Sequence, residues 1–153
     1  MEILNRKARF NYFIIEEIEC GIELFGSEVK SIRNGNCNIK DSYGVIRNNE
    51  VYLINMFIKN YKEASIFNKE ETRKRKLLLH KKEIIKLKEK IEKEGYTLIP
   101  LKVYFNRNKV KVLLGLCKGK KTYDKREVLK EKEIKRKIER EIKKLLTNSL
   151  ITF

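Results

Sequence analysis

Residues 96–116, YTLIPLKVYFNRNKVKVLLGL, decide the fold class of this chain. In Leu101–Phe105 apolar residues alternate with Lys102 and Tyr104, which is the two-residue period of a β-strand. The segment Asn106-Arg107-Asn108 separates this run from Val110–Leu116, so the pattern predicts a β-hairpin. Because proline has no N–H to donate, we expect Pro100 at a sheet edge or at the start of a strand.

A second hairpin is expected earlier in the chain. The apolar runs Tyr43–Ile46 and Val51–Phe57 flank Asn48 and Asn49, which tolerate the positive φ angles of a tight turn. A further strand is predicted from Arg9 through Ile15, with a possible continuation after Gly21.

Two helices are expected beside these strands. The first runs from Gly26 to Asn34, with Ser27 as N-cap and Gly35 as the stop. The second carries Ile84, Leu87 and Ile91 at helical spacing and ends at Gly95. Residues 60–76 have weak periodicity and many charges, and we interpret them as a long loop.

About five strands, with a helix between the first three and the last two, indicate an all-β fold, an OB-type Greek-key barrel with two helices and a basic C-terminal tail. A split α/β sandwich is compatible with the same strand and helix counts. The predicted domains are a barrel over residues 1–123 and a tail over residues 124–153.

The charge of the chain indicates a polyanionic partner. The 153 residues include 37 Lys or Arg and 21 Asp or Glu, for a formal net charge of +16. A hydrophobic content of 41% is enough to build a core. No apolar run approaches the roughly 20 residues of a membrane span, and the first ten residues lack the features of a signal peptide. We therefore expect a cytoplasmic protein.

The sequence offers little material for catalysis. Cys20, Cys37 and Cys117 are widely spaced and are interpreted as reduced thiols, with no metal and no cofactor expected. The aspartates are Asp41 and Asp124, and no paired-carboxylate site is visible. The one histidine, His80, lacks an identifiable nucleophile and orienting acid, which favours packing at a helix entry or contact with RNA over general-base chemistry. An enzyme is not expected.

Basic clusters beside aromatic residues point to nucleic acid. Arg73-Lys74-Arg75-Lys76, Lys118–Lys121 with Tyr123, and the pair Lys30 and Arg33 offer charges for phosphates. Tyr61 or Tyr123 could stack on an unpaired base. These clusters indicate a nucleic acid without specifying which one.

The C-terminal part has a different character. Residues 118–144 hold thirteen Lys or Arg and six acids, and the apolar positions Ile134, Ile138, Ile142 and Leu145 form a helical stripe only one residue wide. We expect a tail that is disordered alone and becomes a basic helix when phosphates neutralise its self-repulsion. A solvated helix packed on the barrel, or a coiled-coil arm, is the alternative.

Six ordered blocks of sequence carry a specific resemblance. They are Asn5-Arg6-Lys7-Ala8, Gly26-Ser27-Glu28-Val29-Lys30-Ser31-Ile32-Arg33-Asn34-Gly35, Asp41-Ser42-Tyr43, Arg75-Lys76-Leu77-Leu78-Leu79-His80-Lys81, Gly95-Tyr96-Thr97-Leu98-Ile99-Pro100-Leu101, and Lys118-Gly119-Lys120-Lys121-Thr122-Tyr123-Asp124-Lys125-Arg126. With this order and spacing, the chain resembles the small protein B family, the SsrA-binding proteins, over residues 5 to about 143.

The resemblance implies an OB-type barrel that binds the tRNA-like domain of transfer-messenger RNA (tmRNA) and delivers it to stalled ribosomes for trans-translation. The family's tail enters the empty mRNA channel and engages rRNA at the decoding centre, and we expect a monomer. With the basic clusters included, the predicted RNA-binding residues are Glu28, Lys30, Ser31, Arg33, Arg75, Lys76, His80, Lys118, Lys120, Lys121 and Tyr123. The predicted ribosome-engaging tail residues are Asp124, Lys125, Arg126, Lys130, Arg136, Lys137, Arg140, Ile142 and Lys143.

Two alternatives stay open at this point. Glu28 cannot neutralise a phosphate, so it either accepts hydrogen bonds from RNA or forms a structural ion pair that orients basic residues, for example Arg33. The chain as a whole could instead be a ribosome-associated structural protein that binds rRNA. Co-purification with rRNA but not with tmRNA would favour that function.

Overall fold

The computed structural model describes residues 2–60, 70–120 and 132–145 of the chain. Contacts divide the chain into two units, Met1–Gly119 and Lys120–Phe153, and we call the first unit the body. The predicted domain boundary after residue 123 lies among residues outside the described ranges, so it stays a prediction.

The body is built mainly from β-strands, as the sequence predicts, with three short helices between them. The strands are β1 (Glu2–Leu4), β2 (Tyr12–Ile22), β3 (Cys37–Asn38), β4 (Tyr43–Arg47), β5 (Glu50–Ile54), β6 (Phe57–Ile58), β7 (Arg75–Leu78), β8 (Thr97–Asn106) and β9 (Lys109–Gly119). The helices are α1 (Ala8–Asn11), α2 (Gly26–Arg33) and α3 (Lys81–Glu94).

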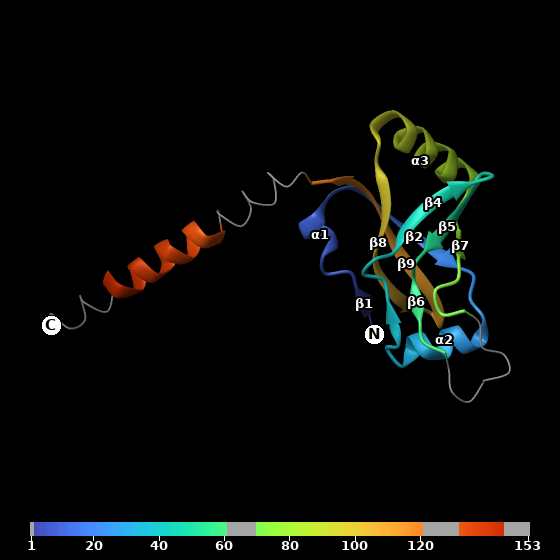
Figure 1. Cartoon of the computed structure of the whole chain (residues 1–153), viewed down its shortest axis with the longest axis horizontal. Helices are drawn as coiled ribbons and strands as arrows, with labels where there is room; N and C mark the ends of the chain where they lie inside the picture. Colours follow the sequence, from blue (N-terminus) through green and yellow to red (C-terminus); the bar gives the residue numbers. More distant parts are fainter. Residues whose placement is uncertain (1, 61–69, 121–131, 146–153) are drawn as a thin grey trace. The chain divides into compact units, whose positions relative to one another are not determined.

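Seven of the described strands form one antiparallel sheet in the order β1-β8-β4-β5-β7-β2-β9. Because β8 also pairs with β9, the hydrogen-bonded pairings return to their starting strand and the sheet closes on itself. The closure between β4 and β8 runs through Gly44 and Leu98. Figure 1 shows α2 and α3 at opposite ends of this closed sheet.

Both predicted hairpins are confirmed. Strands β4 and β5 pair with Arg47 opposite Glu50, and strands β8 and β9 pair with Asn106 opposite Lys109. The turn residues Asn48, Asn49, Arg107 and Asn108 all have φ between 50° and 65°. Two consecutive left-handed residues are what a type I′ turn requires, and this turn matches the twist of the strands that it joins.

The sequence predicts Pro100 at a sheet edge or at the start of a strand, and this prediction is wrong. It is the fourth residue of β8, where the pairing with β9 shifts register between Pro100 and Lys102. A β-bulge tolerates a residue that has no N–H to donate. On the other side of the strand, the Asn5 side-chain amide donates to the Pro100 carbonyl at 3.0 Å.

The first predicted helix is confirmed, but its start differs from the prediction. Helix α2 begins at Gly26, and the residue before it is Phe25, whose backbone N–H donates to the Glu28 carboxylate at 2.9 Å. Ser27 therefore lies inside the helix and does not cap it. Gly35 follows the helix with φ of 76°, as expected for the stop.

The predicted loop over residues 60–76 ends earlier than expected, because β7 begins at Arg75. Sequence patterns do not reveal the start of this strand, because the first of its two inward-facing residues, Arg75, is charged and the second is Leu77. The core contains Leu53, Met56, Leu98 and Leu114, each fully buried. Helix α3 covers this core with Ile84 and Leu87, and it ends at Gly95 with φ of 70°, as predicted.

Residues 132–145 form a helix in the second unit. Its apolar stripe is exposed, from 52% for Ile138 and Ile142 to 67% for Leu145. No helix among the described residues is long and apolar enough to cross a membrane.

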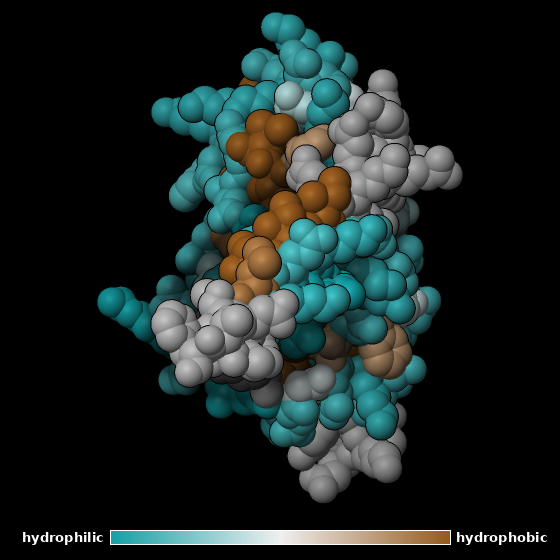
Figure 2. All heavy atoms as spheres, turned by 90° about the vertical axis from the view of Figure 1, so that its left-hand side faces the viewer, coloured by the Kyte–Doolittle hydropathy of each residue, from teal (hydrophilic) through white to brown (hydrophobic). Residues whose placement is uncertain are grey.

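The face drawn in Figure 2 is mostly hydrophilic, and its hydrophobic side chains are gathered in one part of it.

Candidate nucleic-acid interface

The predicted RNA-binding residues of the body occupy three places. Glu28, Lys30, Ser31 and Arg33 lie on α2. Arg75 and Lys76 lie on β7, and His80 lies at the entry to α3. Lys118 is the last residue but one of β9, and Lys120 follows the strand. Lys121 and Tyr123 lie outside the described residues.

Glu28 is a buried carboxylate held by two arginines. Its side chain is 7% exposed, and its oxygens lie 2.5 Å from an Arg73 nitrogen and 2.6 Å from an Arg75 nitrogen. Burial would raise the pKa of the Glu28 carboxyl, but hydrogen bonds from Arg73, the Phe25 backbone and Arg75 outweigh burial and lower it. Glu28 thus forms a structural ion pair, one of the two roles that its sequence position allows. Its partners are Arg73 and Arg75 and not Arg33.

Arg75 is completely buried, although it belongs to a cluster predicted to bind phosphate. Its guanidinium donates to the Met56 and Glu71 carbonyls, and its Nε donates to Glu28 at 2.8 Å. Burial lowers the pKa of Arg75, and the hydrogen bond and charge of Glu28 oppose that shift. A charge this deeply buried is tolerated because its donors are satisfied inside the protein. The geometry therefore gives Arg75 a positioning role between α2, β5 and β7.

Ser31 is also buried, and its hydroxyl donates to the Lys59 carbonyl at 2.6 Å. This bond fastens α2 to the segment that follows β6. The neighbouring Lys30 and Arg33 are exposed, and the Arg33 guanidinium lies 5.1 Å from the centre of the Phe105 ring. Of the four residues predicted on α2, Lys30 and Arg33 are thus the ones whose side chains an RNA can reach.

Alternation along β7 divides the predicted cluster Arg73-Lys74-Arg75-Lys76 between two faces of the sheet. Arg75 points inward, whereas Lys74 is exposed and Lys76 is partly exposed. The Lys74 ammonium lies 4.3 Å from the centre of the Tyr52 ring, and Lys76 forms a 2.9 Å ion pair with Glu50. The hydrogen bond from Lys76 lowers the pKa of Glu50, and the same bond raises the pKa of Lys76.

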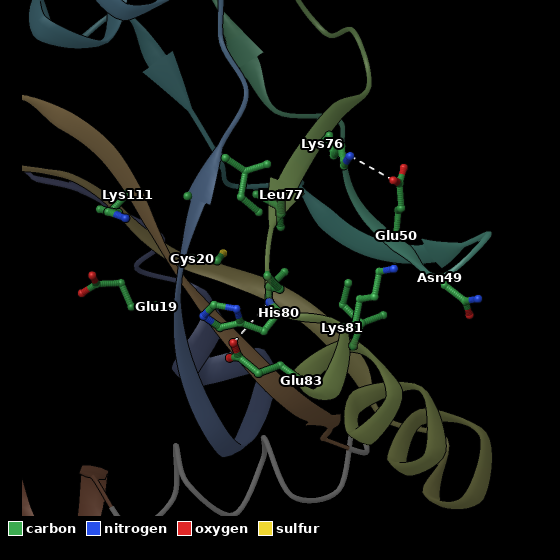
Figure 3. Close-up of a pocket in the computed structure, with 14 residues that line it drawn as sticks. Glu19, Cys20, Asn49, Glu50, Lys76, Leu77, His80, Lys81, Glu83 and Lys111 are labelled. Carbon is green, nitrogen blue, oxygen red and sulfur yellow. Dashed lines mark hydrogen bonds and ion pairs between the residues drawn. The ribbon is translucent and has the colours of Figure 1, made fainter.

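A hollow of about 460 Å³ lies where β2, β7 and β9 meet the start of α3. Figure 3 shows its labelled rim, with Lys76, Lys81 and Lys111 among the residues that supply positive charge. The His80 backbone N–H donates to Glu83 at 3.3 Å, which caps α3, while Glu50 is paired with Lys76. Carboxylates, lysines and backbone groups together can bind ribose hydroxyls, base edges and phosphates.

Lys111 and Glu19 also line the hollow, and no sequence pattern marks them as site residues. Gly21 on β2 pairs with both Leu78 on β7 and Lys111 on β9, and this pairing brings Lys111 to the rim. Within the described ranges, Lys111 forms no ion pair with a carboxylate. Alternation along β9 places Lys111 on the outer face of the sheet. Which residues surround it depends on the pairing of β9 with β2 and of β2 with β7.

The remaining predicted residues lie at the end of β9, in helix 132–145 or outside the described residues. Lys118 is exposed at the end of β9, opposite Phe13 in register, and Lys120 is partly exposed. In the second unit, helix 132–145 carries exposed Arg136, Lys137, Arg140, Ile142 and Lys143. Asp124, Lys125, Arg126 and Lys130 lie outside the described residues.

The three cysteines are not placed for redox or metal chemistry. Burial raises the pKa of Cys20 and Cys37 to about 12 and that of Cys117 to about 11, so their thiols are poor nucleophiles at neutral pH. None is in a disulfide. Across the described ranges, no group of three or more His, Cys, Asp or Glu side chains is arranged to hold a metal ion.

Comparison with known proteins places this surface in context. The family described as SmpB protein matches residues 2–144. The SsrA-binding protein of Clostridium tetani is 58% identical over 139 residues, which cover 91% of this chain and 89% of the relative. The SsrA-binding protein of Borreliella afzelii is 53% identical over 141 residues, covering 92% of this chain and 94% of the relative.

A solved structure gives the same result in three dimensions. A chain from the structure described as "tmRNA-SmpB: a journey to the center of the bacterial ribosome" superposes with a TM-score of 0.66 and is 48% identical. The match covers 79% of this chain and 85% of that chain. The likeness therefore extends over most of the fold as well as most of the sequence.

Proposed function

Because this chain belongs to the SmpB family, we propose that it binds the tRNA-like domain of tmRNA and delivers it to stalled ribosomes for trans-translation. The observation that carries the proposal is identity of 53–58% to SsrA-binding proteins over about nine-tenths of the chain. The similar solved structure, whose description joins tmRNA, SmpB and the ribosome, supports the same function. The protein acts in the cytoplasm as an RNA-binding factor and not as an enzyme.

The closed sheet has the architecture that such a factor needs. We assign it to the OB type, with Greek-key connections, because a small closed antiparallel sheet of this kind presents strands and loops to oligonucleotides. Its RNA surface consists of the exposed cations Lys30, Arg33 and Lys118 together with the rim of the hollow at α3. Lysine and arginine at this surface neutralise phosphates and fix the register of the RNA.

Within this proposal, the buried predicted residues act indirectly. Glu28, Ser31 and Arg75 hold α2 and β7 in position, so that Lys30, Arg33 and Lys76 face outward from a rigid frame. A preformed frame lowers the entropy cost of ordering these side chains when RNA binds.

The tail performs the second half of the function. Residues 124–153 enter the empty mRNA channel, and the basic side chains of helix 132–145 neutralise rRNA phosphates while its apolar stripe packs against a ribosomal surface. A stripe one residue wide buries little apolar area, so helix 132–145 gains most of its stabilisation when a partner surface covers the stripe.

The test is the affinity of the full chain for tmRNA, for an RNA duplex of equal length and for rRNA, measured over a range of salt concentrations. We expect clear preference for tmRNA and a log-log salt slope of roughly −4 to −5, corresponding to about six neutralised phosphates. Equal affinity for tmRNA and the duplex would overturn the proposal. Binding to rRNA without tmRNA would instead identify a structural ribosome-associated protein.

A further inference from the structure

Another pocket, of about 290 Å³, lies between α1, the start of β2, the turn that precedes β4 and the start of β8. It shares no lining residue with the hollow at α3. Its volume is at the small end of the range for ligand-binding clefts, so it suits a single small chemical group. We call it the α1 pocket, and the polar side chains that line it include Asn5, Tyr12, Lys40, Asp41, Ser42 and Tyr43.

The hydroxyl of Ser42 is buried at this pocket without a partner. The residue is 3% exposed, and its Oγ forms no hydrogen bond within the part of the chain that the structure describes. Buried polar groups in folded proteins are almost always hydrogen-bonded, because an unpaired one destabilises the fold. An unpaired hydroxyl beside a pocket therefore marks a position where a polar atom of a ligand can complete the hydrogen bonding.

The turn that carries Ser42 is fixed by hydrogen bonds. The Ser42 backbone N–H donates to the Ile39 carbonyl at 3.1 Å. The Asn5 side-chain amide donates to the Ile39 carbonyl at 3.4 Å and to the Pro100 carbonyl at 3.0 Å, which ties the turn to β8. The Asn5 backbone N–H also donates to the Leu101 carbonyl at 2.9 Å. The α1 pocket is therefore preformed, so a ligand that binds there has to order little of the chain.

Other polar groups of the pocket are not used by the body. The amide nitrogen of Asn5 is occupied, but its Oδ1 accepts no hydrogen bond from any described residue. Over the same ranges, the Asp41 carboxylate and the Lys40 ammonium take part in no ion pair. Tyr43, on β4, is 38% exposed, and Tyr12 lines the pocket from β2. The pocket thus offers acceptors, a hydroxyl, a cation and aromatic rings.

This set of groups fits an unpaired guanine better than the other RNA bases. The Watson–Crick edge of guanine carries two adjacent donors, N1–H and the 2-amino group, and a carboxylate can accept from both. Adenine and cytosine place an acceptor nitrogen beside their amino group, and uracil places its N3–H between two carbonyls. Each of these bases would therefore turn a lone pair toward a carboxylate. Proteins read unpaired bases by hydrogen bonds to this edge and by stacking on aromatic rings.

We propose that the α1 pocket binds one unpaired guanine of RNA, with Asp41 accepting from N1–H and the 2-amino group and Ser42 donating to O6. The Tyr43 ring stacks on the base, and Lys40 binds the adjacent phosphate. The inference rests on the proposed function in taking RNA as the partner. It goes beyond that function because the RNA surface assigned above lies at α2, Lys118 and the hollow at α3.

The test uses the full chain and three fluorescently labelled pentanucleotides, UUGUU, UUAUU and UUIUU, where I is inosine, which lacks the 2-amino group of guanosine. Fluorescence anisotropy should show UUGUU binding roughly tenfold more tightly than UUAUU, with UUIUU between them because it keeps N1–H. In Asp41→Asn the ratio of the UUGUU and UUAUU affinities should fall to about one, because the amide cannot accept both hydrogen bonds.

Glu92→Gln is the matched control, because Glu92 is another exposed carboxylate, lies on α3 and does not line the α1 pocket. It changes the net charge by the same amount as Asp41→Asn and should leave the affinity ratio unchanged. Tyr43→Leu should weaken the binding of both oligonucleotides several-fold while keeping their ratio, which separates stacking from base recognition. Circular dichroism of each variant confirms that the fold is intact.

Ser42→Ala tests whether the buried hydroxyl serves the ligand or the fold. Because the hydroxyl has no partner within the described residues, its removal should not lower the melting temperature of the free protein. The same variant should bind UUGUU several-fold more weakly. A lower melting temperature with unchanged UUGUU binding would overturn the assignment of this hydroxyl to the ligand.

Kethoxal, which reacts with N1 and the 2-amino group of unpaired guanine, identifies the source of the base. In tmRNA and in ribosomes, probed separately, the full chain should protect a guanine that stays reactive with Asp41→Asn. The RNA that contains this guanine is the ligand.

Three outcomes overturn the inference: equal affinity for UUGUU and UUAUU, an unchanged ratio in folded Asp41→Asn, or no such protected guanine in either RNA. In each of these cases the chain can still prefer tmRNA to a duplex, so the proposed function is tested separately. If the chain shows no preference for tmRNA, the proposed function fails, whereas the pentanucleotide ratios still decide the guanine site.

Discussion

Helix α3 and helix 132–145 are made of the same kinds of residues but stand in different environments. Both are rich in Lys and Glu, and both place isoleucine or leucine three or four residues apart. In α3, Ile84 is 6% and Leu87 is 2% exposed, whereas Ile138 in the second helix is 52% exposed.

Two features account for the difference. Helix α3 has a reciprocal cap at His80 and Glu83 and a left-handed stop at Gly95, and it joins two strands of the closed sheet. The chain on each side therefore holds it against a ready-made core. Helix 132–145 belongs to the unit Lys120–Phe153 and has only a narrow stripe to bury. Periodicity therefore identifies a helix, but the surface available to that helix decides whether it stabilises the fold.

The largest expected effect separates the two regions by function. Deleting residues 124–153 should reduce tagging of stalled nascent chains to background while leaving most of the tmRNA affinity, because the proposed function assigns the RNA surface to the body and ribosome engagement to the tail. The measurements are a cell-free tagging assay and tmRNA binding by the same protein. Comparable losses in both assays would contradict a modular tail.

The next effect compares apolar truncation in the two helices. Leu87→Ala should lower the free energy of unfolding by about 3 kcal/mol, because it leaves a cavity beneath α3. Ile138→Ala, at an exposed position, should change it by less than about 0.5 kcal/mol. Urea denaturation of both variants measures the difference. A loss of similar size in Ile138→Ala would show that its side chain is buried in solution.

Removing a carboxylate should also cost more stability in the body than in helix 132–145. Glu28→Gln should cost about 2–3 kcal/mol, because it leaves Arg75 buried without its counter-charge. Glu139→Gln, on the exposed helix, is the control and should be near neutral.

The contribution of Glu28 to the free energy of unfolding should also depend on pH. Its folded pKa lies below the ordinary value of 4.5, so its stabilisation is complete above that pH and is lost as pH falls through the lowered folded pKa. Denaturation from neutral to acidic pH should therefore show a smaller acid destabilisation in Glu28→Gln than in the unsubstituted protein. An identical pH profile would mean that the carboxylate is not ionised in the fold.

The smallest effect concerns the end of α3. Gly95 has φ of 70°, so Gly95→Ala should destabilise the body by about 1 kcal/mol. Gly26→Ala, where an added Cβ meets no atom within 4 Å, is the control. Thermal unfolding measures both. An unchanged melting temperature in Gly95→Ala would indicate that the helix end rearranges.

Much of the fold was predictable because local patterns and tertiary contacts agree. The two hairpins depend on strand alternation and on turns at Asn48-Asn49 and Arg107-Asn108, which are properties of neighbouring residues. Strand β7 was missed because Arg75 occupies an inward position, where a pattern of apolar residues was expected. The bulge at Pro100 likewise depends on β9 and on the distant Asn5.

Part of the candidate site was also predictable from sequence, and part of it was not. Sequence alone identified Lys30, Arg33, Lys76 and His80 as RNA-facing candidates, and the structure places Lys30, Arg33 and His80 on the exposed surface and Lys76 partly so. The sequence did not identify Lys111, because its neighbours at the hollow come from strands that are distant in the chain.

The amino-acid sequence by itself determined the mainly-β class, the hairpins and the basic character of the chain, since these follow from local periodicity, turn residues and composition. The family was identified separately, from the resemblance carried by six ordered blocks of sequence. Tertiary structure decided which charges face outward and which are buried. A carboxylate such as Glu28 and a guanidinium such as Arg75 look like surface residues in a sequence. They can be buried together because the fold brings α2 and β7 side by side, so that the two charges lie within 3 Å of each other and the remaining donors of Arg75 reach backbone carbonyls.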